Sequence, residues 1–170
     1  LRVGMVSGAV GTHATVPPSV EETVCRELGL NVAKITNQII QRDRHAHFMS
    51  TLALIAASLE KFATEIRALQ RTELHELEEP FGHGQTGSSS MPHKRNPELS
   101  ERICGLARLI RGNSVTALEN VALWGERDIS HSSVERVAGP DANVCVHFML
   151  TRLRGLIDGL IVYPETMKRN

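Results

Sequence analysis

Aromatic residues, an excess charge of one sign and long apolar runs are all scarce in this 170-residue sequence. Aromatic residues make up 4%, and Lys plus Arg equal Asp plus Glu at 19 each. Nucleic-acid-binding proteins normally carry a basic excess, so the balanced charge argues against that class. No apolar run reaches the roughly 20 residues that a membrane-spanning helix needs. Because Cys25, Cys104 and Cys145 are odd in number and widely spaced, they indicate free thiols and a cytoplasmic location.

Glycine and proline are absent between Asn37 and Pro80, and this absence favours one long helix. Apolar residues in the stretch recur at spacings of four and three, at Phe48, Leu52, Ile55, Leu59, Phe62, Ile66 and Leu69. That spacing predicts a helix from about Asn37 to about Glu76, roughly 60 Å long, with a narrow apolar seam. Such a seam needs equally long partners. The expected fold class is therefore all-α, an elongated bundle of long helices that associates with copies of itself.

Three further helices are expected. Ser19–Glu22 resembles a capping box, and the helix that it opens should stop at Gly29. Leu99, Ile103, Leu106 and Ile110 repeat the four-three spacing of a helix. A last helical pattern runs from Asp141 to about Val162, with Gly139-Pro140 as the break and Asp141 as the N-cap.

A glycine- and serine-rich segment, Phe81–Pro97, interrupts the predicted helices. Long loops inside helical bundles are usually functional or disordered. Asn96-Pro97 is typical of a helix start with Asn as N-cap, so the helix amides should lie beside Lys94 and Arg95. This arrangement predicts an anion site. A flexible linker is the alternative, because Gly and Ser dominate linkers, although a linker has no need of Met91.

The run GSSSMPHKRNP, Gly87–Pro97, resembles the signature loop of the fumarase/aspartase superfamily, whose pattern is GSSxMPxKxNP. Its MPHKRNP form is most similar to the adenylosuccinate lyase family. The runs SGAVGTHA from Ser7, QRDRHA at Gln41–Ala46 and WGERDISHSSVER at Trp124–Arg136 agree with that family, and the resemblance extends to Asn170. It implies β-elimination of fumarate from adenylosuccinate, giving AMP, and from SAICAR, giving AICAR, in purine biosynthesis. It implies no metal or organic cofactor.

The resemblance also implies roles for individual residues. Ser88 is the expected general base, and Lys94 is expected to stabilise the charge that develops when the proton is removed. Substrate contacts are expected from Gln38, Ser89, Asn96, Arg127, Ser132 and Arg136. Ser132 and Arg136 are four residues apart and would share one helix face. Glu101 is expected to support the polar groups of the site, although Arg102 stands where the family often has Asn.

In the same family the general acid lies on a Thr-His segment upstream of the matched region. The surroundings of Thr12-His13 resemble a later family segment, so that role is not transferred to His13. We therefore expect residues 1–170 to be part of the central helical-bundle domain, without the family's N-terminal and C-terminal domains, and to be inactive alone. The resemblance implies a homotetramer with shared active sites, a nucleotide substrate, and neither nucleic acid nor membrane as partner.

Three alternatives remain open at this point. The chain could come from another fumarate-releasing lyase of the superfamily, such as argininosuccinate lyase. It could be a catalytically silent structural helical fragment. It could also be a generic coiled-coil interaction module, which explains the apolar seam but leaves the loop without a purpose. For Arg127 and Arg136, salt bridging with neighbouring carboxylates is the competing interpretation.

Overall fold

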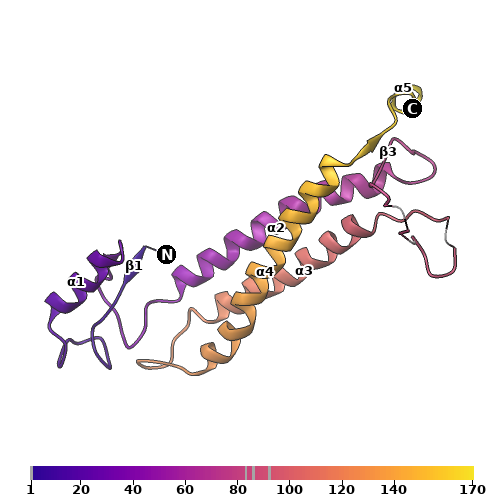
Figure 1. Cartoon of the computed structure of the whole chain (residues 1–170). Coiled ribbons are helices and arrows are strands. Elements are labelled where there is room, and N and C mark those ends of the chain that lie inside the picture. Colours follow the sequence, from indigo (N-terminus) through magenta and orange to yellow (C-terminus); the bar gives the residue numbers. More distant parts are fainter. Residues whose placement is uncertain (1, 83, 86, 92) are drawn as a thin grey trace. The chain divides into compact units, whose positions relative to one another are not determined.

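The computed structural model describes residues 2–82, 84–85, 87–91 and 93–170, and the expected all-α fold is confirmed (Figure 1). Its helices are α1 (Pro18–Glu27), α2 (Asp43–Leu69), α3 (Glu98–Glu119), α4 (Ser130–Asp158) and α5 (Pro164–Arg169). The strands are β1 (Val3–Gly4), β2 (Asn31–Val32), β3 (Leu77–Glu78) and β4 (Ile161–Val162). β1 pairs with β2 in parallel, and β3 pairs with β4 antiparallel. Within the described part of the chain, no helix is both long and apolar enough to cross a membrane.

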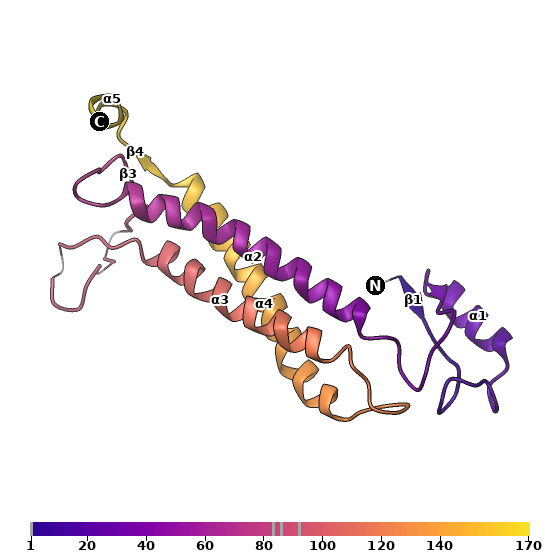
Figure 2. The ribbon, with the colours of Figure 1, turned by 180° about the vertical axis from the view of Figure 1, so that it is seen from behind.

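The chain divides into two compact units. Unit 1 comprises Leu1–Thr51 and Asn113–Pro140, and it contains α1 and the β1–β2 pair. Unit 2 comprises Leu52–Gly112 and Asp141–Asn170, and it contains the β3–β4 pair, α5 and the signature loop. The three long helices, α2, α3 and α4, each contribute residues to both units (Figure 2).

The long helix α2 is shorter at both ends than the predicted span of residues 37–76. It covers Asp43–Leu69, 27 residues, or about 40 Å. Before it, the Arg42 guanidinium bonds both the carbonyl of Ile40, at 2.9 Å, and the carboxylate of Glu135, at 2.5 Å. After it, the backbone of His75 takes a positive φ of 48°, which a helix cannot contain. The segment before α2 is therefore held by a distant partner and the segment after it by local backbone geometry, and the apolar spacing reports neither.

Only half of the predicted seam on α2 is buried in unit 2. The buried large residues there are Leu52, Leu59 and Ile66. Alternating with them, Ala56 and Ala63 are fully buried, whereas Ile55 and Phe62 are exposed. Alanine side chains allow the neighbouring elements to approach closely, and Thr64 on α2 lies 3.6 Å from the thiol of Cys104 on α3. The predicted seam included only large apolar residues and therefore omitted the buried alanines.

The expected start of a helix at Asp141 is wrong. α4 begins at Ser130 and continues through Pro140. Its first turn is capped by Asp128, whose carboxylate accepts the backbone N–H of Ser130 at 2.9 Å, and this bond lowers the pKa of Asp128. Pro140 has no N–H, so the helix lacks one intrahelical bond at that point and nevertheless continues.

The expected capping box of the first helix is also wrong. α1 begins at Pro18, with Pro17 as N-cap and no side-chain capping bond, so Ser19 lies inside the helix. Proline at the first helical position has no N–H, so that position needs no capping acceptor. The expected stop is confirmed, because Gly29 follows the helix with a φ of 66°.

Candidate active site

The signature loop is closed at its base by a backbone contact between Gly87 and Lys94. A Cβ atom on Gly87 would lie 1.7 Å from the carbonyl oxygen of Lys94, so only glycine fits this approach. The Asn96 amide reinforces the closure by donating to the Gly87 carbonyl at 2.8 Å. Ser88 directly follows Gly87, and the structure therefore brings the backbones on which Ser88 and Lys94 stand close together.

We predict that Gly87→Ala lowers kcat of the full-length protein on the order of 100-fold. The added methyl group must push the Lys94 carbonyl away, and a displacement of about 1 Å at a site can cost that much. Gly82→Ala is the matched control in the same loop, because its Cβ would meet its nearest neighbour, the Gln85 side chain, at an ordinary 3.7 Å. Equal rates for the two variants in a steady-state assay would contradict the closure argument.

Ser88 is half-buried, and its hydroxyl oxygen is placed to accept from two backbone amides. The N–H groups of Ser90 and Met91 both lie 3.4 Å from Ser88 Oγ. These bonds are long, but both N–H donors point at Ser88 Oγ, the atom that would carry the negative charge if Ser88 acted as a base. Amide donors favour the charged form of an oxygen, which a serine hydroxyl needs before it can take a proton. Ser89, the next residue, is exposed.

The predicted anion site at the start of α3 is wrong, because the protein's own Glu79 occupies it. The Glu79 carboxylate is 6% exposed and accepts the backbone N–H of Leu99 at 3.2 Å and that of Ser100 at 2.8 Å. It also accepts the Ser100 hydroxyl at 2.6 Å. Asn96, the expected N-cap, instead directs its amide to Gly87. In the sequence, the only local indication of this cap was the acidic pair Glu78-Glu79, which lies just before the loop.

Lys94, Asn96 and Glu101 line an open cleft of about 730 Å³ in unit 2. Arg67 and Arg71, from the end of α2 and just beyond it, line the same cleft. Lys94 and Glu101 are exposed there, and Asn96 is half-buried. The cations of Arg67, Arg71 and Lys94 outnumber the single carboxylate of Glu101, so the cleft has a positive potential that suits an anionic ligand.

The remaining predicted site residues lie in unit 1. Gln38 is exposed in the loop before α2 rather than at the start of the helix, where it was expected. Its backbone N–H donates to the carbonyl of Glu126 at 3.3 Å, which brings Gln38 beside the segment that carries Arg127. The prediction that Ser132 and Arg136 share a helix is confirmed, because both lie on the first turns of α4.

The competing interpretation of the two arginines as salt-bridge partners is wrong within the described residues. Glu135 pairs with Arg42, and Asp128 caps α4. Arg127 and Arg136 are both exposed and have no ion-pair partner in the part of the chain that the structure describes. With no ion pair among the described residues, the guanidinium groups of Arg127 and Arg136 are available to an anion such as phosphate.

Two histidines of unit 1, His13 and His45, have defined surroundings. His13 contacts Glu21 at 3.3 Å and the carbonyl of Val16 at 3.1 Å, and its φ is 57°. His45 lines a small apolar cavity of about 200 Å³, and burial, followed by the nearby Arg42 cation, lowers the pKa of His45. His45 lies on α2 and is partly buried.

Long helices that frame a loop bearing serine and lysine define the all-helical class of the fumarase/aspartase superfamily. The family model described as Lyase matches residues 1–112, and the chain belongs to this family. Over all 170 residues the chain is 61% identical to adenylosuccinate lyase of Synechocystis sp. and 58% identical to adenylosuccinate lyase of Bacillus subtilis. It spans 39% of the length of each of these relatives.

The solved structure of 3-carboxy-cis,cis-muconate lactonizing enzyme from Pseudomonas putida has a similar fold. It superposes with a TM-score of 0.87 at 33% identity, over 100% of this chain and 38% of that one. The helical arrangement found here is therefore shared with a solved enzyme named for a different activity, so the fold alone does not select the substrate.

Proposed function

We propose that this chain is the central part of an adenylosuccinate lyase, which releases fumarate from adenylosuccinate to give AMP and from SAICAR to give AICAR. The observation that carries the proposal is the closed base of the loop, where Gly87 packs on the backbone of Lys94 and Ser88 follows directly. The identity of 61% and 58% to two adenylosuccinate lyases supports this substrate among those of the superfamily.

In the proposed reaction Ser88, as the alkoxide, takes the proton from the carbon next to a substrate carboxylate. The electron pair left behind is delocalised into that carboxylate, and the Lys94 ammonium stabilises the added charge. The pair then forms the carbon–carbon double bond of fumarate as the C–N bond breaks. The leaving nitrogen takes a proton from a general acid, which we assign to a part of the full-length protein outside residues 1–170.

The proposal assigns substrate contacts to residues of each unit separately. Ser89 and Asn96 bind near the reacting carboxylates, and Glu101 supports the polar groups of the loop cleft. In unit 1, Gln38 contacts the substrate, and Arg127, Ser132 and Arg136 bind its nucleotide part. The two unpaired arginines support this role, because a guanidinium matches a phosphate with two parallel hydrogen bonds.

Self-association is also proposed, as a cytoplasmic homotetramer with shared active sites. In unit 2 the long helices expose large apolar side chains at Ile55, Phe62, Leu109, Val144, Leu150 and Ile157. Exposed apolar residues that recur along helices are typical of surfaces covered by another subunit. The nucleotide substrate and copies of the same chain are the only partners proposed.

Fumarate release by the full-length protein tests the proposal. We expect cleavage of adenylosuccinate and SAICAR, followed by absorbance, and no cleavage of argininosuccinate. Cleavage of argininosuccinate instead would assign the other lyase activity, and no fumarate from any of the three would support a structural role. Residues 1–170 alone are expected to be inactive, and activity in them would mean that the acid lies within this chain.

A further inference from the structure

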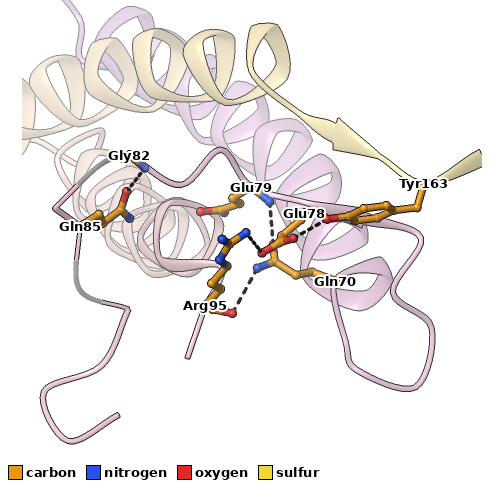
Figure 3. Close-up of polar contacts among 7 residues, drawn as sticks. All are labelled: Gln70, Glu78, Glu79, Gly82, Gln85, Arg95 and Tyr163. Carbon is orange, nitrogen blue, oxygen red and sulfur yellow. Dashed lines mark hydrogen bonds and ion pairs between the residues drawn. The ribbon is translucent and has the colours of Figure 1, made fainter. Parts of the chain in front are cut away.

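Arg95 stands beside Lys94 in the signature loop and is held by three separate contacts, of which those to Glu78 and Gln70 are drawn in Figure 3. Its guanidinium lies 3.1 Å from a carboxylate oxygen of Glu78 and 5.1 Å from the ring centroid of Phe81. Its carbonyl accepts the side-chain amide of Gln70 at 3.4 Å. The other end of the Gln70 amide accepts the backbone N–H of Glu79 at 3.0 Å. Arg95 is thus tied to the end of α2 and to β3.

Glu78 connects Arg95 to a residue far along the chain. Its second carboxylate oxygen accepts the hydroxyl of Tyr163 at 2.7 Å, across 85 residues of sequence (Figure 3). Tyr163 is fixed in turn, because its N–H donates to the carbonyl of Glu76 at 2.9 Å and its ring stacks on His75 at 4.5 Å. The phenol, the carboxylate and the guanidinium form one continuous chain of polar contacts.

The partners of Glu78 are needed because its side chain is buried. Glu78 is 5% exposed, and a carboxylate withdrawn from water is stable only when it is paired and hydrogen-bonded. Arg95 supplies the opposite charge, and Tyr163 supplies a donor to the remaining oxygen. Because Tyr163 binds one oxygen and Arg95 the other, Tyr163 helps to fix the orientation of the carboxylate on which Arg95 is held.

Among the described residues, few other contacts fix the position of Lys94. Its side chain is exposed, and its backbone has one turn bond, from its N–H to the carbonyl of Met91 at 3.0 Å. On the other side its carbonyl abuts Gly87, a contact that excludes movement toward the loop but not away from it. The anchored Arg95 is the next residue and limits that outward movement.

We propose that Arg95 is a positioning residue for Lys94, and that Tyr163 acts on the same position through the buried Glu78 carboxylate. The inference rests on the proposed lyase function, in which Lys94 stabilises charge in the transition state. It assigns catalytic consequences to Arg95, Glu78 and Tyr163, three residues that do not touch the reacting atoms.

The test compares Arg95→Met, Tyr163→Phe and the double variant in the full-length protein. We expect kcat per folded active site to fall about tenfold in Arg95→Met and about threefold in Tyr163→Phe, with KM within about twofold. The double variant should be no slower than Arg95→Met, because Arg95→Met already breaks the contacts that run from Tyr163 through Glu78 to Arg95. Arg95→Lys, which keeps the charge, should recover part of the rate. Arg102→Met is the matched control, since Arg102 is an exposed arginine paired with Glu98 on α3.

Three results would overturn the inference. Wild-type kcat in Arg95→Met or Tyr163→Phe would do so while leaving the proposed function intact. Losses that multiply in the double variant would show that Tyr163 does not act through Arg95. If the wild-type protein cleaves no substrate, the proposed function fails, and amide exchange decides the inference by itself. Faster exchange at residues 93–96 in Tyr163→Phe than in wild type would then support it, and unchanged exchange would reject it.

Discussion

Replacing Ser88 by alanine is expected to lower kcat of the full-length protein by about 10³-fold, with little change in KM. Proton transfer by a positioned base contributes on the order of 10² to 10⁴ in rate, and among the described residues no other hydroxyl has the same two amide donors. The loss should fall on kcat because the proposed role of Ser88 is in the transition state rather than in substrate binding. Absorbance-monitored cleavage of adenylosuccinate measures both constants.

Ser90→Ala is the matched control for this prediction. Ser90 is exposed two residues away, and it contributes only its backbone N–H to Ser88, which alanine retains. We expect its rate to stay within about threefold of the wild type. A Ser88→Ala protein as fast as Ser90→Ala would exclude Ser88 as the base and direct attention to another residue of the loop.

Replacing Glu79 by alanine is expected to lower the free energy of unfolding by about 2–4 kcal/mol. The change removes an N-terminal cap, for which about 0.5–2 kcal/mol is typical, and leaves buried donors of Leu99 and Ser100 without an acceptor. Denaturant unfolding followed by helical circular dichroism measures the loss. Glu79→Gln should lose less, because an amide oxygen can still accept from the same groups.

Glu98→Ala is the control for the cap. Glu98 lies in the first turn of the same helix, but its side chain is partly exposed and pairs only with exposed Arg102. Exposed pairs of this kind contribute about 0.3–0.5 kcal/mol. If Glu79→Ala were no more destabilising than Glu98→Ala, the Glu79 carboxylate would not be the group that holds the start of α3.

The contact between Tyr163 and Glu78 also has an electrostatic consequence. The hydrogen bond from the phenol to the Glu78 carboxylate, together with burial, raises the pKa of Tyr163. The hydroxyl therefore stays protonated and remains a donor across the ordinary range of pH. A positioning role for Tyr163 consequently needs no titration of the phenol.

The sequence by itself determined the all-helical class, the position of the loop and the stop of α1 at Gly29. It also placed Ser132 and Arg136 on one helix. These features depend on neighbours within a few residues: apolar spacing, the torsional freedom of glycine, and a motif that is contiguous in the chain. Local patterns of this kind can be read from the sequence alone.

Only the tertiary structure decided where α2 begins, what caps α3 and how the signature loop is anchored. The loop before α2 is held by Glu135, more than 90 residues away, and the cap of α3 comes from Glu79 rather than from adjacent Asn96. The bond between Tyr163 and Glu78 spans 85 residues. Contacts of this kind depend on which distant groups packing brings together and buries. A polar group so placed takes whichever partner lies in reach, and the local pattern does not specify that partner.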